Sequence, residues 1–216
     1  MKKVALISFV AVVLLASCKD SKKETIAESA KDDVILQEEE VVDDLPNPSD
    51  LSFTDALAEY EKGNYDKAAD YIEYGVIRLR EEEKPTEGVT GILLDMEIQN
   101  LRSIEDNVRE NKIKDIDVLT QSMANAEMLL AHDYVIYTVA SLGDAPPKSG
   151  YYYDKALRSL DKALSKLNGD AKKEAQQIRE ESKKIEDKVK SGSKDSEKDL
   201  KKMTQRIEDF LKKNKI

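Results

Sequence analysis

Apolar and charged residues alternate at three- and four-residue spacings from residue 51 to the C-terminus. This spacing is typical of amphipathic α-helices, and Gly and Pro fall almost only where one such segment ends and the next begins. The pattern predicts helices over residues 52–62 and 65–83, joined at Gly63-Asn64 and followed by a break at residues 85–88. We therefore predict an all-α fold, either a helical bundle or a set of packed helical hairpins.

A third, longer helix is predicted after this break, and a fourth over residues 115–142. The third helix is marked by Val89, Ile92, Leu93, Met96, Leu101, Ile104 and Val108. The first half of the fourth carries an apolar stripe at Ile116, Leu119, Met123, Ala126 and Leu130. Residues 134–139 of the fourth helix are apolar nearly all round, which is typical of a helix that packs on more than one side. We expect this segment to lie at the centre of the domain.

A loop is predicted at residues 143–150, and a fifth helix at residues 151–167 that ends at Asn168-Gly169. Beyond it, residues 170–216 repeat a thin apolar seam that predicts two amphipathic helices joined as a hairpin. The seam consists of Ala171, Ala175, Ile178, Ser182, Ile185, Val189, Leu200, Met203, Ile207 and Phe210. So thin a seam is unstable alone, so we expect the hairpin to lie on another surface.

Charge divides the helical part into two unlike halves. Residues 51–150 carry 10 basic and 20 acidic side chains, whereas residues 151–216 carry 19 basic and 13 acidic ones. The simplest interpretation is that the basic hairpin (residues 170–216) packs against the acidic helical domain (residues 51–169). The alternative is that the hairpin meets an anionic lipid, lipopolysaccharide or another polyanion.

The segment before the helices has the composition of a tether. Residues 19–50 hold eleven acidic residues and four lysines, and such a segment buries too little apolar surface to offset its chain entropy. We predict a disordered tether over residues 18–50. Its two apolar clusters, residues 34–36 and 41–42, are interpreted as linker residues, with docking on a partner as the alternative.

The N-terminus has a different composition again. Lys2 and Lys3 precede an apolar run over residues 4–15, which is too short for a stable membrane-spanning helix and predicts a secretory signal over residues 1–17. Residues 15–18, Leu-Ala-Ser-Cys, resemble the lipobox of bacterial lipoproteins. The resemblance implies that Cys18 becomes the first mature residue and carries lipid; the alternative is an ordinary signal peptide followed by a stray cysteine. Because Lys19 rather than aspartate follows the cysteine, the lipoprotein sorting rule implies the outer membrane, on its periplasmic side or at the cell surface.

Two short stretches resemble one another and a known repeat. Residues 63–75 are similar to the turn and second helix of a tetratricopeptide repeat, with Gly63 turning the chain, Tyr65 packing in the hairpin, and Ala68 and Gly75 at small positions. The sequence Tyr-Asp-Lys-Ala at residues 65–68 occurs again at residues 153–156. The separation between the two copies is not a multiple of the usual repeat length. The resemblance implies at most two related hairpins. If the first hairpin binds a protein, its candidate contact residues are Tyr60, Tyr65, Tyr71 and Tyr74; the other interpretation of the tyrosines is packing with a polar tip.

Candidate catalytic chemistry is sparse. The chain has one histidine, one cysteine and no glycine-rich phosphate loop, so we expect neither an enzyme nor a bound cofactor, and no nucleic-acid partner. Met96, Met128 and His132 could ligate haem or a cuprous ion, although methionines at helical spacing usually fill a core. The favoured hypothesis is a non-catalytic, membrane-anchored envelope lipoprotein that binds another envelope protein or acts as a scaffold. The alternative is a helical bundle that holds haem, metal or a small amphiphile, and the oligomeric state is left open.

Overall fold

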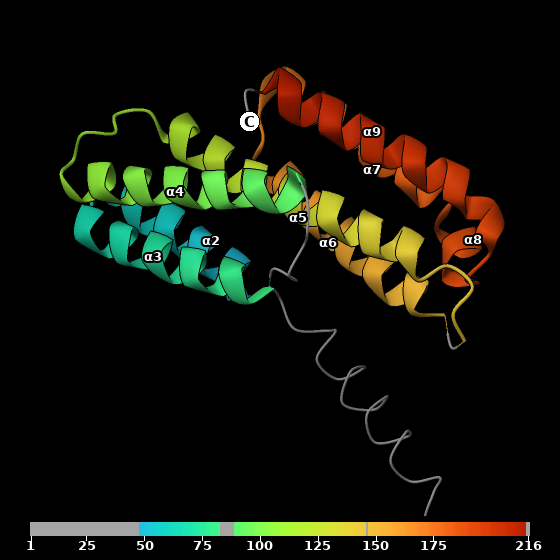
Figure 1. The fold of residues 1–216 in the computed structure, drawn as a ribbon. Helices are drawn as coiled ribbons and strands as arrows, with labels where there is room; N and C mark the ends of the chain where they lie inside the picture. The colour runs from blue at the N-terminus through green and yellow to red at the C-terminus, as the bar shows by residue number, and fades with distance from the viewer. Residues whose placement is uncertain (1–47, 83–88, 146, 215–216) are drawn as a thin grey trace, which may run out of the picture. The chain divides into compact units, whose positions relative to one another are not determined.

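The computed structural model describes residues 48–82, 89–145 and 147–214, and this part of the chain contains helices and no strand (Figure 1). The all-α prediction is therefore confirmed. The predicted signal, the lipobox and residues 18–47 of the predicted tether lie outside the described residues. Residues 48–50, also predicted to belong to the disordered tether, instead form the first turn of the first described helix. In chain order the elements are α2 (Pro48–Glu61), α3 (Tyr65–Glu82), α4 (Val89–Arg109), α5 (Ile116–Ala140), α6 (Lys148–Lys166), α7 (Gly169–Lys183), α8 (Glu186–Lys190), the 3-10 turn η1 (Lys194–Ser196) and α9 (Glu197–Lys213).

Helices α2 and α3 form a tightly packed hairpin. Gly63 turns the chain with φ = +77°, a conformation that favours glycine, as the sequence predicted. Further along α3, Gly75 lets the ring of Phe53 on α2 lie against the helix backbone, because a Cβ added at Gly75 would be 2.3 Å from the ring. Ala68 is fully buried in the same hairpin. Small residues on α3 therefore permit the close approach of α2.

Helix α4 packs between α3 and α5, but not through all of the apolar residues that mark it in the sequence. Leu101, Ile104 and Val108 are buried as expected. In the first half of the helix, however, the buried apolar residues are Leu94 and Ile98, whereas Val89, Ile92 and Met96 are exposed. The predicted third helix is therefore present, but two apolar faces share its first half, and the neighbouring helices cover only one of them.

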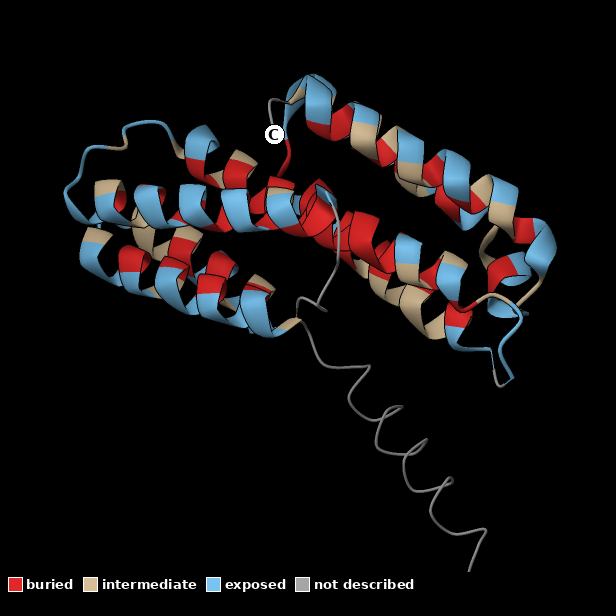
Figure 2. Cartoon of the chain, in the orientation of Figure 1, coloured by how far each residue is buried: buried red, intermediate tan, exposed pale blue. Residues whose placement is uncertain are grey.

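Helix α5 is the central element, in contact with α2, α4, α6 and α9. Asp115 caps its N-terminus by accepting a hydrogen bond from the backbone N–H of Asp117 (2.9 Å). The continuously buried stretch is residues 122–135, which Figure 2 shows as the red middle of the helix. The predicted centre at residues 134–139 is therefore too far along the chain, and Ile136 is 39% exposed.

Helix α6 begins three residues before its predicted start, so Ser149 and Gly150 belong to the helix and not to the loop. It packs along α5 over most of its length and buries Tyr153, which lies in the second Tyr-Asp-Lys-Ala stretch. Gly169, with φ = +57°, follows α6 closely and opens α7. The fifth helix thus ends within two residues of the predicted Asn168-Gly169.

The tail beyond Gly169 is amphipathic as predicted, although the short α8 and η1 interrupt the hairpin between α7 and α9. Its seam is buried at Ala175, Ile178, Ser182, Val189, Leu200, Met203, Ile207 and Phe210. Helices α7 and α8 contact α6, and α9 contacts α5 and α7. All of these elements belong to one compact unit with α2–α6.

The salt bridges that join the tail to the rest of the domain are not the ones expected from the charges of the two halves. Arg179 of α7 forms a bidentate pair with Asp161 of α6 at 2.8 and 2.9 Å, and Lys190 pairs with Asp154 at 2.8 Å. Both acids belong to the basic half of the chain (residues 151–216). Where the tail meets α5, the buried side chains of α9 are mainly aliphatic and aromatic. The tail is therefore held on the domain mainly by its apolar seam rather than by attraction to the acidic half.

Candidate functional site

The four candidate tyrosines form two ring pairs on the α2–α3 hairpin. Tyr60 and Tyr65 meet edge to face at 5.4 Å between ring centroids, and Tyr71 and Tyr74 at 6.5 Å. The Tyr60 hydroxyl donates a 2.9 Å hydrogen bond to the carbonyl of Ile113, and partial burial raises its pKa. This bond ties the hairpin turn to the segment before α5. Only Tyr74 of the four is exposed, so the other three are mainly packing residues.

The three candidate haem or copper ligands do not form a common site. Met96 is exposed on α4, whereas Met128 is fully buried in α5. His132 Nδ1 lies 2.9 Å from Thr90 Oγ1 of α4, and His132 Nε2 lies 3.4 Å from a carboxylate oxygen of Glu208 on α9. Burial lowers the pKa of His132, so the neutral imidazole is favoured. His132 therefore bridges three helices, and no group of three His, Cys, Asp or Glu side chains in the described residues could hold a metal ion.

A buried charge cluster, which sequence reasoning missed, lies where α2, α3, α5 and α6 meet. Glu127 of α5 is 0% exposed, and neither of its carboxylate oxygens has a hydrogen-bond partner. The Nζ atom of Lys162 on α6 is also buried without a partner. Burial raises the pKa of Glu127 to about 7, although Lys162 and Lys166 oppose this rise. Burial likewise lowers the pKa of Lys162.

The cluster continues to the first turn of α2. Lys166 of α6 is buried and forms a salt bridge with Asp50, and Glu82 of α3 accepts hydrogen bonds from both the backbone N–H (3.0 Å) and the hydroxyl (2.8 Å) of Ser49. These contacts fix the point at which the chain enters the described fold. Because Glu127 has no exposed surface and burial raises its pKa, its ionisation bears on the stability of the domain. The sequence signal that could have revealed this cluster was Glu127, the one glutamate of the largely apolar helix α5.

The α4 stripe, defined as Val89, Ile92 and Met96, is the most exposed apolar surface of the described residues. The three side chains are 73%, 63% and 60% exposed and follow one another at spacings of three and four residues. They therefore lie on one face of α4, over about 10 Å at 1.5 Å per residue. Single exposed aliphatic residues are ordinary, but an aligned group of this exposure is typical of a binding surface.

A comparison of the chain with protein-family models, curated proteins and solved structures finds no match. None of the described helices is both long and apolar enough to cross a membrane. The geometry and charge of the α4 stripe are therefore the basis for assigning a function to it.

Proposed function

We propose that this protein is a lipid-anchored, non-catalytic module of the bacterial cell envelope that binds a basic amphipathic helix of another envelope protein on the α4 stripe. The observation that carries the proposal is the exposure of Val89, Ile92 and Met96 in one line on a well-packed helix. Apolar side chains at spacings of three and four residues match the contact positions of a second helix. The lipobox-like residues 15–18 support anchoring in the outer membrane through Cys18.

The charge of the partner is proposed from the charge around the stripe. Residues 51–150, which include the whole of α4, carry twice as many acidic as basic side chains. Asp95 stands beside the stripe and is only loosely paired, at 3.7 Å, with Arg80. An acidic surface attracts a cationic partner and repels an anionic one. A helix with one apolar face and lysines or arginines at its edges therefore fits better than an acidic helix.

Binding can be tested on residues 19–216 with two designed helical peptides that share one leucine pattern. One peptide carries lysines and the other carries glutamates at the polar positions, and each is labelled for fluorescence anisotropy. We expect the lysine peptide to bind at least about tenfold more tightly, a difference of about 1.4 kcal/mol. Ile92→Glu should abolish this binding. Val118→Glu is the matched control, because Val118 is an exposed aliphatic residue of α5 outside the stripe.

Equal binding of the lysine peptide to Ile92→Glu and Val118→Glu would exclude the α4 stripe as the surface. Equal binding of the two peptides would exclude the proposed charge of the partner. The position can then be examined in intact cells with a photoreactive amino acid at Ile92 or at Val118. A defined adduct from Ile92 alone is expected, and it should disappear when Met96→Glu is added.

The anchor is tested separately. Cys18→Ser should release the protein from the membrane fraction and abolish labelling by a fatty-acid analogue, because lipid chains contribute about 0.8 kcal/mol per buried methylene to membrane attachment. Unchanged membrane association would refute the anchor and leave the α4 stripe to be judged by the peptide experiment.

A further inference from the structure

A cavity of about 310 Å³ lies between the second half of α7 with the turn after it and the first half of α9, away from the α4 stripe. Its apolar walls are Ile178 and Ile185 on one side and Met203 of α9 on the other, with Ser182 between them. α7 ends at Lys183, and the chain turns before α8 begins at Glu186. The cavity therefore stands where the regular contact between α7 and α9 is interrupted.

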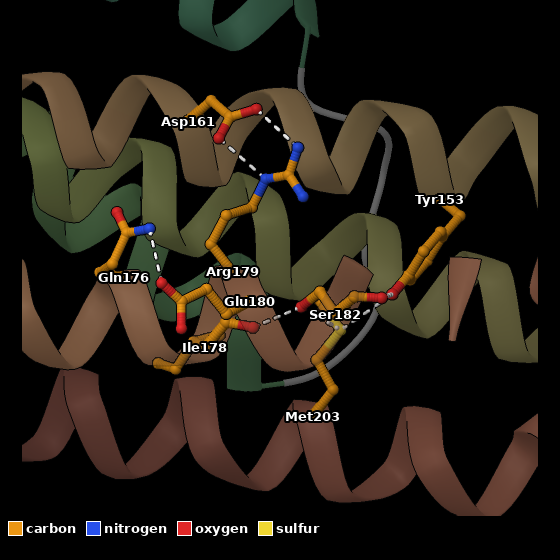
Figure 3. Close-up of polar contacts among 8 residues, drawn as sticks. All are labelled: Tyr153, Asp161, Gln176, Ile178, Arg179, Glu180, Ser182 and Met203. Carbon is orange, nitrogen blue, oxygen red and sulfur yellow. Dashed lines mark hydrogen bonds and ion pairs between the residues drawn. The ribbon is translucent and has the colours of Figure 1, made fainter. Parts of the chain in front are cut away.

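The polar groups in the cavity floor already have partners, as Figure 3 shows. The Tyr153 hydroxyl donates a 2.6 Å hydrogen bond to the carbonyl of Ser182, and the Ser182 hydroxyl donates a 2.7 Å bond to the carbonyl of Ile178. The Ser182 oxygen also lies 3.2 Å from the sulfur of Met203. A ligand therefore meets a floor without free hydrogen-bonding groups, which suits a hydrocarbon chain. Methionine adapts readily to such a ligand because its side chain is flexible and unbranched.

The rim of the cavity is charged and has an excess of cations. Arg206 at the rim is 3.2 Å from Glu181, and Asp199 is 3.2 Å from Lys188, so both rim acids already have basic partners. Lys184 and Lys202 complete the rim, and neither has an acidic partner among the described residues. Two unpaired ammonium groups beside an apolar floor favour a ligand with a hydrocarbon chain and an anionic head.

The volume limits the length of that chain. Small-molecule sites usually start at about 300 Å³. At about 310 Å³ the site lies at the lower end of this range, which suits a short rather than a long hydrocarbon chain. We propose that this cavity binds a medium-chain fatty-acid carboxylate, with the chain against Met203, Ile178 and Ile185 and the head group at Lys184 and Lys202. The site is independent of the proposed function, because it shares no residue with the α4 stripe.

The experiment is isothermal titration calorimetry of residues 19–216 with decanoate below its micellar concentration. We expect saturable one-to-one binding. Decyltrimethylammonium, which has the same chain and the opposite charge, should bind at least about tenfold more weakly, because the rim repels it. The double variant Lys184→Glu/Lys202→Glu should weaken decanoate binding by a similar factor.

The matched control is Lys67→Glu/Lys172→Glu, which makes the same change in net charge at exposed lysines outside the cavity. It should leave decanoate binding within about twofold of the original value. The proposal is overturned if decanoate shows no saturable binding, if the cationic amphiphile binds equally well, or if the two double variants behave alike. Ile92→Glu should not affect decanoate binding, so failure at the α4 stripe and failure at the cavity are distinguishable.

Discussion

Glu127→Gln should stabilise the domain above pH 7 and leave its stability unchanged near pH 4. The glutamate is fully buried without a hydrogen-bond partner, between Lys162 and Lys166 of α6, Asp50 of α2 and Glu82 of α3. Burial raises its pKa from 4.5 in the unfolded chain to about 7 in the fold. As the pH rises from about 4.5 to 7, the unfolded chain therefore loses this proton first. The free energy of unfolding falls over that interval and then levels off.

The size of the effect follows from this difference in pKa. At 1.36 kcal/mol for each pKa unit, the ionised Glu127 costs the folded state about 3 kcal/mol at pH 8. Glutamine has nearly the same shape and is neutral at every pH, so the variant should avoid this cost. For a domain of this size, 3 kcal/mol corresponds to an increase in Tm of about 6–12 °C. At pH 4, where Glu127 is protonated in both states, the two proteins should unfold together.

The assay is urea unfolding, followed by circular dichroism, of both proteins at intervals from pH 4 to pH 8. The difference between their free energies of unfolding should grow between about pH 4.5 and 7. His132 acts in the opposite direction because burial lowers its pKa, but it is present in both proteins and cancels in the difference. Glu73→Gln, at an exposed position of α3, is the control for the loss of one carboxylate. If Glu127→Gln is instead less stable than the original protein at pH 8, attraction to the two lysines outweighs burial and the reasoning is wrong.

Five further substitutions, two of which serve as comparisons, test the packing. Gly75→Ala should destabilise the domain by about 1–3 kcal/mol in thermal unfolding, because the new methyl group overlaps the ring of Phe53. Gly150→Ala should be neutral or slightly stabilising in the same assay, because the nearest atom is at an ordinary contact distance of 3.5 Å. Leu129→Ala should cost about 2–5 kcal/mol in urea unfolding because Leu129 is fully buried, whereas Ile136→Ala should cost less than about 1 kcal/mol because Ile136 is partly exposed. Equal losses of stability would contradict this difference in burial. Tyr153→Phe removes the buried hydrogen bond from the tyrosine hydroxyl to the Ser182 carbonyl, which keeps a 3.1 Å bond from the backbone N–H of Ile185, and should cost about 0.5–1.5 kcal/mol; an unchanged unfolding midpoint would refute that role.

The helices themselves could be predicted because the spacing of apolar residues is a local property of the chain. The spacing fixes which side chains share a helix face, and Gly63 and Gly169 mark conformations that glycine favours. The seam of the tail was predicted nearly in full for the same reason. It has one narrow apolar face on each helix, so only one face could be buried.

Tertiary structure decided which of several apolar faces became the core. The first half of α4 offers Leu94 and Ile98 on one face and Val89, Ile92 and Met96 on another, and only the position of α3 and α5 determines that the first is buried. The spacing of apolar residues therefore did not distinguish the exposed α4 stripe from the buried face of the same helix.

The buried charges depended on tertiary structure even more strongly. Glu127 lies on α5 and Lys162 on α6, while Asp50 comes from the start of α2, so their meeting depends on how three helices pack. Local spacing in the sequence places side chains on a helix face but does not say what covers that face. It therefore determined the helices of this protein, and the packing of those helices alone decided which apolar residues stay exposed and which charges are buried together.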